Sequence, residues 1–78
     1  MRAILSNADA LELHALIEDN PGATLELKVI DVREIERNVT IGLKGTGIVF
    51  EALARRTPGD AGSLVIEDYD GRRILEAR

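Results

Sequence analysis

At 78 residues, this chain has room for one domain, and it is close to the size at which a single core supplies only a few kcal/mol of stability. Hydrophobic residues make up 45% of the sequence and charged residues 31%, a balance typical of a globular protein and not of a disordered or membrane protein. Because cysteine is absent, disulfides, thiolate catalysis and zinc sites with cysteine ligands are excluded. We expect one domain spanning residues 1–78.

From the sequence we expect neither a targeting signal nor a membrane anchor. Every apolar run is shorter than the roughly 20 residues that a spanning helix needs, and the segment after Met1 is too short for a signal peptide. We therefore expect a cytoplasmic protein with no membrane association.

The net charge of −4 is unevenly distributed. Residues 1–38 carry four basic and eight acidic side chains, whereas residues 39–78 carry six of each. An acidic surface repels nucleic-acid phosphates and favours a basic protein surface. The alternative is an ordinary solvated helix surface, which is the commoner cause of such a charge pattern.

The first predicted elements are a short strand and a helix. Residues Arg2–Leu5 form an apolar strand candidate, and Ser6 with Asp9 three positions later is typical of a capped helix start. The helix is predicted over Asn7–Asp19 and ends before Asn20–Gly22. Four apolar residues share one face at helical spacing: Ala10, Leu13, Leu16 and Ile17. Leu11 falls outside that face.

The segment Thr24–Lys44 is predicted to form a β-hairpin with its turn at Glu34–Asn38. Apolar residues alternate through Leu25, Leu27 and Val29, but Val29 and Ile30 are adjacent and Val32 follows Ile30 at the strand period. The apolar side therefore crosses to the other face unless a bulge restores the register. One helix covers only one face of a sheet. Apolar residues on the other face therefore need a second helix, a second subunit or a partner to cover them.

Residues Ile48–Arg56 allow two interpretations. Ala, Leu and the two arginines favour a helix, whereas the preceding Gly45 and Gly47 favour a hairpin turn into a strand with Phe50 and Ala52 on one face. We favour the helix. Ser63–Glu67 and Arg73–Ala77 are predicted strands, joined by a turn that contains an Asp-Gly pair.

These elements predict the α+β class, with a small antiparallel sheet of about four or five strands and one or two helices packed on one face. The expected order is strand, helix, strand, strand, helix or strand, strand, strand.

The sequence contains only weak matches to metal-binding, nucleotide-binding and catalytic motifs. Asp68, Asp70 and Gly71 match only the start of a calcium loop, and a hairpin turn already explains them. The glycines at 42, 45 and 47 lack the order of a nucleotide-binding loop. His14, the only histidine in the sequence, has no nucleophile beside it. We expect no catalytic residue, no metal site and no cofactor.

Two groups of residues are candidates for binding. Tyrosine and arginine dominate binding hot spots, so Tyr69, Arg72 and Arg73 are expected to contact a partner protein, together with the acidic helix residues Glu12 and Asp19. Surplus apolar strand surface predicts a homodimer. The self-association residues are expected to be Leu25, Leu27, Ile30 and Val32.

The sequence therefore favours a small, acidic, non-enzymatic protein that acts by protein–protein binding. The most specific form of this hypothesis is a phage or mobile-element inhibitor of a host defence system, an anti-CRISPR-like role. One alternative is a nucleic-acid-binding regulator that uses the C-terminal arginines, which the missing second exposed aromatic makes less favourable. Another is a small homodimeric structural or adaptor domain. A small-molecule or catalytic domain would require a concave site near Gly45–Gly47 or His14.

Overall fold

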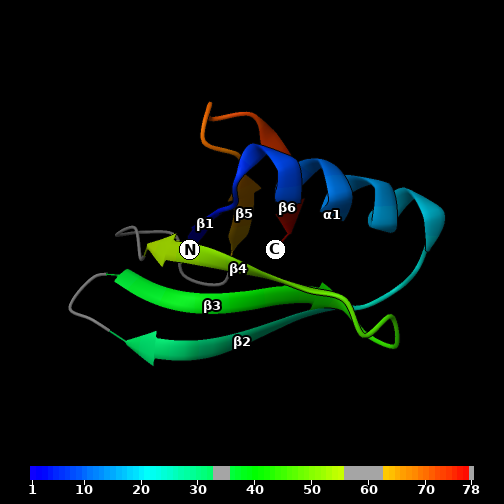
Figure 1. Cartoon of the computed structure of the whole chain (residues 1–78), viewed down its shortest axis with the longest axis horizontal. Coiled ribbons are helices and arrows are strands. Elements are labelled where there is room, and N and C mark those ends of the chain that lie inside the picture. The colour runs from blue at the N-terminus through cyan, green and yellow to red at the C-terminus, as the bar shows by residue number, and fades with distance from the viewer. Residues whose placement is uncertain (33–35, 56–62, 78) are drawn as a thin grey trace.

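The computed structural model describes residues 1–32, 36–55 and 63–77, which form one sheet and one helix. Figure 1 shows helix α1 lying across one side of the sheet. The elements in chain order are β1 (Arg2–Ile4), α1 (Asn7–Asp19), β2 (Leu25–Val32), β3 (Glu36–Leu43), β4 (Val49–Arg55), β5 (Leu64–Glu67) and β6 (Arg73–Ala77). The predicted α+β class is correct.

The sheet has six strands in the order β2-β3-β4-β1-β5-β6. The short β1 lies between β4 and β5, antiparallel to β4 and parallel to β5. The sheet is therefore mixed and larger than the antiparallel sheet of four or five strands that the sequence predicted. The physical reason is that β1 pairs with segments about 50 to 60 residues away, and such pairing leaves no periodicity in the local sequence.

Helix α1 has the predicted bounds and the predicted orientation. The Ser6 hydroxyl accepts a hydrogen bond of 3.2 Å from the Asp9 amide, which satisfies one of the free N–H groups of the first turn. Ala10 and Leu13 are buried against the sheet, and Leu16 and Ile17 pack against the same core. Leu11 is 68% exposed, as its position outside the apolar face predicted.

The β2–β3 hairpin shows on which face of the sheet the apolar residues of β2 lie. A bulge between Val29 and Asp31 shifts the register, so that Val32 pairs with Arg37. Val32 consequently returns to the face that Val29 shares with Val39, and Ile30 at the bulge lies on the opposite face. The predicted turn at Glu34–Asn38 is wrong in its second half, because β3 already begins at Glu36. The first half of that turn lies outside the described residues.

The favoured helix at Ile48–Arg56 is wrong, and the strand alternative is correct. Residues Val49–Arg55 form β4, which pairs with β3 on one side and β1 on the other. Phe50, Ala52 and Ala54 are buried beneath the helix. Two flanking strands satisfy the backbone of β4 on both sides, and this pairing outweighs the helical propensity of its alanines. Residues beyond Arg55 in this predicted helix lie outside the described part of the chain.

The turn between β3 and β4 shows why its glycines are present. Gly45 and Gly47 have φ values of +89° and +72°, a region that residues with a side chain rarely adopt. Between them, the Thr46 hydroxyl donates a hydrogen bond of 2.8 Å to the Leu43 carbonyl. These are turn glycines.

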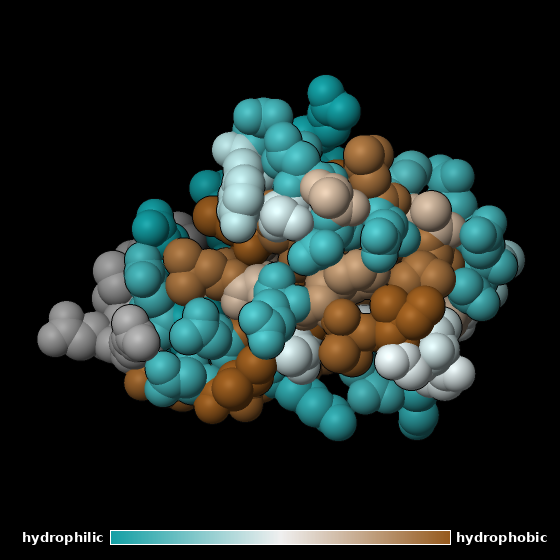
Figure 2. Space-filling model, viewed as in Figure 1, coloured by the Kyte–Doolittle hydropathy of each residue, from teal (hydrophilic) through white to brown (hydrophobic). Residues whose placement is uncertain are grey.

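The hydrophobic core lies between α1 and the sheet face that α1 covers. Alternate residues of the strands point into it, among them Ala3, Val39, Ile41, Ala54 and Ile66, all with no exposed surface. Figure 2 shows that hydrophobic residues also reach the surface along the lower edge of the molecule, where β2 runs. No described element covers the opposite face of the sheet, which we call the open face.

Candidate protein-binding surface

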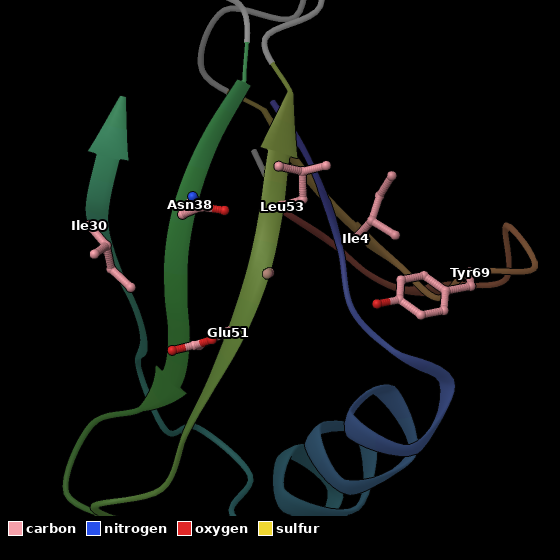
Figure 3. A pocket seen from close by; sticks show the side chains of 7 residues that line it. Ile4, Ile30, Asn38, Glu51, Leu53 and Tyr69 are labelled. Carbon is pink, nitrogen blue, oxygen red and sulfur yellow. The ribbon is translucent and has the colours of Figure 1, made fainter. Parts of the chain in front are cut away.

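The open face carries an open hollow of about 520 Å³. Its lining residues come from four strands and from the turn between β5 and β6: Ile4, Ile30, Asn38, Glu51, Ala52, Leu53 and Tyr69. Figure 3 shows Leu53 and Ile4 on neighbouring strands, with the ring of Tyr69 turned toward Ile4. The hollow thus presents apolar and polar groups in about equal measure, a mixture that protein–protein interfaces also show.

Strand register explains how this surface is assembled. Leu53 is the direct partner of Ile4 on β1 and of Asn38 on β3, so these three side chains form a row across the open face. Glu51 lies two residues before Leu53 on β4 and therefore points to the same face. Ile30, at the bulge of β2, is 58% exposed at one side of the hollow.

Tyr69 is positioned by a tightly bonded turn. The buried Asp68 carboxylate accepts hydrogen bonds from the amides of Asp70 at 2.9 Å and Arg72 at 2.8 Å. The Tyr69 amide donates to the Asn7 side chain at 2.9 Å, which links the turn to the start of α1. The backbone is held while 72% of Tyr69 remains exposed, so the ring is available to a partner.

Among the residues that line the hollow, Glu51 is a carboxylate without an ionic partner in the described part of the chain. Arg55 binds Glu36 through contacts of 2.9 and 3.0 Å, and Arg2 binds Glu67 at 2.8 Å, so both arginines have an acidic partner. Glu51 forms no ion pair or hydrogen bond with the described residues. A cationic group entering the hollow would therefore find a free negative charge.

The five partner-binding residues expected from sequence do not form one surface. Tyr69 lines the hollow, and Arg72 is exposed in the same turn. Arg73 begins β6 and forms an ion pair of 3.0 Å with Glu76. Glu12 and Asp19 are exposed on α1, which lies on the other side of the sheet.

The four self-association residues expected from sequence all lie on β2. Leu25 and Leu27 are half-buried and pack against the core, whereas Ile30 and Val32 are 58% and 63% exposed. They share one edge of the sheet, but they do not form a single hydrophobic face, because the bulge places Ile30 on the open face.

Sequence reasoning missed Ile4, Asn38, Glu51 and Leu53. A signal existed for two of them, since the strand alternative at 48–56 placed Phe50 and Ala52 on one face and hence Glu51 and Leu53 on the other. The helix interpretation concealed this pairing. Ile4 could not be assigned to the hollow before β1 was known to lie beside β4.

The positions proposed for a catalytic or small-molecule site lie elsewhere. Neither Gly45, Gly47 nor His14 lines the hollow. The His14 side chain is 51% exposed, with Nε2 3.4 Å from the Glu18 carboxylate on the same helix. Within the described ranges, no group of three or more potential metal ligands converges.

No protein-family model, curated protein or solved structure matches this chain. In the part of the chain that the structure describes, no helix combines the length and the apolar character needed to cross a membrane.

Proposed function

We propose that this chain is a non-enzymatic protein that binds another protein through the hollow on the open face. The observation that carries the proposal is a hollow on a sheet face that no described element covers, in which apolar side chains lie beside the unpaired carboxylate of Glu51. Protein–protein interfaces combine apolar and polar area in similar proportions.

The chemistry of the hollow favours a basic partner. The aliphatic part of an arginine or lysine would pack on Ile4 and Leu53, while its cationic end would pair with Glu51. The exposed ring of Tyr69 adds a surface on which a guanidinium can stack. The net charge of −4 would accelerate association with such a partner at low salt.

The narrower hypothesis is an inhibitor of host defence carried by a phage or mobile element. In that form of the proposal, this acidic chain would occupy a basic surface that its target uses for another ligand. The alternative of nucleic-acid binding has less support, since Arg2, Arg55 and Arg73 are each already paired with a glutamate.

Affinity capture from the native host, followed by mass spectrometry, would identify the partner, and variants would locate its binding site. Tyr69→Ala and Glu51→Lys are expected to weaken binding of the identified partner by about tenfold or more, because each removes a contact in the hollow. The matched control is the single charge reversal Glu12→Lys on α1, which changes the net charge by the same amount as Glu51→Lys.

Circular dichroism of every variant would verify that the fold is intact. Equal binding by the two hollow variants and the wild type would contradict the proposal. Loss of binding only in the α1 variant would move the binding site to the helix surface. Salt-sensitive retention on DNA that depends on Arg72 would support the nucleic-acid alternative.

A further inference from the structure

Strand β2 is an outer strand of the sheet, with β3 on one side and no described strand on the other. The Lys44 amide donates a hydrogen bond of 2.8 Å to the Thr24 carbonyl, which fixes the direction of the backbone groups at the start of this strand. Antiparallel pairing alternates, so Glu26 and Lys28 also direct their N–H and C=O groups toward β3. Leu25, Leu27 and Val29 consequently direct theirs toward the free edge, where they are available to another strand.

The side chains along this edge alternate in a regular way. Leu25, Leu27 and Val29 lie on the face that α1 covers, while Glu26 and Lys28 lie on the open face. Neither Glu26 nor Lys28 forms an ion pair with the described residues. The edge therefore presents three apolar residues on one face and two unpaired opposite charges on the other.

We propose that a second copy of this chain pairs with this edge, β2 against β2, in an antiparallel arrangement about a two-fold axis at Leu27. In this register Leu27 faces Leu27 of the second copy, Leu25 faces Val29, and Glu26 faces Lys28. The two residues of each facing pair lie on the same face of the sheet as each other. The pairing satisfies the outward backbone groups of both copies with about six hydrogen bonds, and it forms two Glu–Lys pairs across the interface.

Charge and the bulge together select this register. Centring the axis on Leu25 would place Glu26 opposite Thr24 and Lys28 opposite Gly22, so the opposite charges would not meet. Centring it on Val29 would place Leu27 opposite Asp31 across the bulge, and these two residues lie on opposite faces. Centring it on Glu26 or on Lys28 would place two like charges opposite each other. Shifting the pairing by one residue would place backbone groups that point inward opposite groups that point outward.

The other outer strand, β6, has five residues and pairs with β5 through a register shift of its own, so it offers a shorter and less regular edge. The dimer also goes beyond the proposed function, because Glu26 and Lys28 do not line the hollow. Changes at these two residues therefore test self-association without altering the hollow.

Sedimentation velocity over a range of concentrations would test the dimer. The wild type is expected to reach twice the mass of the 8.5 kDa chain. Lys28→Glu is expected to raise the dimer dissociation constant about tenfold or more, because two attractive pairs become two repulsive pairs. The charge swap Glu26→Lys with Lys28→Glu is expected to restore it to within about threefold. Lys44→Glu, an exposed lysine in the β3–β4 turn, is the matched control and is expected to change nothing.

Amide hydrogen exchange gives a second, residue-specific measurement. The amides of Leu25, Leu27 and Val29 are expected to become protected as the protein concentration rises, whereas those of Glu26 and Lys28 are protected at every concentration. A wild-type monomer at all concentrations would overturn the proposal. So would a dimer that Lys28→Glu leaves unchanged, or one that the charge swap fails to restore.

Discussion

The Tyr69 amide donates a hydrogen bond of 2.9 Å to the Oδ1 atom of Asn7, a residue 62 positions earlier in the chain. The Asn7 amide group also donates to the Asp70 carboxylate at 2.9 Å. One side chain at the start of α1 therefore fastens the turn that carries Tyr69 and determines where its ring stands beside the hollow.

Replacing Asn7 with alanine removes both of these hydrogen bonds. Since both are exposed, we expect Asn7→Ala to lower the free energy of unfolding by about 1 kcal/mol, measured by urea denaturation. Glu12→Ala, an exposed position on the same helix, is the control and should stay within about 0.5 kcal/mol of the wild type. Equal stability of the two variants would show that the Asn7 contacts do not hold the turn.

Asp68 is the second residue on which this turn depends. Asp68→Ala leaves the Asp70 and Arg72 amides without the buried carboxylate that they share as an acceptor, and we expect a loss of about 2 kcal/mol in unfolding free energy. Asp68→Asn keeps an acceptor oxygen and should lose about half as much. Amide exchange at Arg72 should accelerate in the alanine variant, and unchanged exchange there would contradict this role for the carboxylate.

Leu13 and Leu11 of α1 offer a matched test of the core. Leu13 is fully buried, so Leu13→Ala should lower the free energy of unfolding by about 3 kcal/mol through lost burial and the cavity left behind. Leu11 is 68% exposed, so Leu11→Ala should change it by less than about 0.5 kcal/mol. Thermal and urea denaturation would measure both. Similar losses in the two variants would contradict the orientation of the helix.

Gly42 on β3 has no room for a side chain. A Cβ atom there would lie 2.5 Å from the Ile48 carbonyl oxygen and 3.0 Å from Cγ1 of Val49. Because a backbone atom must move, Gly42→Ala should cost about 2 kcal/mol in unfolding free energy. Thr40→Ala, on the same strand and face, is the control and should cost about 1 kcal/mol or less. A Gly42→Ala protein as stable as the wild type would show that the hairpin adapts without strain.

The sequence predicted every element whose signals are local. The Ser6 cap and the spacing of Ala10 and Leu13 were sufficient for α1, and the Asp-Gly pair was sufficient for the β5–β6 hairpin. Neighbouring residues carry these signals, so no knowledge of the rest of the chain was needed. The sequence also indicated that one helix would leave part of the sheet uncovered, which is the basis of the proposed binding role.

Only the tertiary structure decided which strands are neighbours in the sheet and which residues meet across them. Ile4 and Leu53 meet because β1 inserts between β4 and β5, a pairing across about 50 residues that no local pattern encodes. The same pairing made β4 a strand, since hydrogen bonds to two neighbours outweigh the weak helical preference of its alanines. The hollow, and the outer position of β2, follow from the order of the strands, which is set by long-range packing and not by the residues of any one strand.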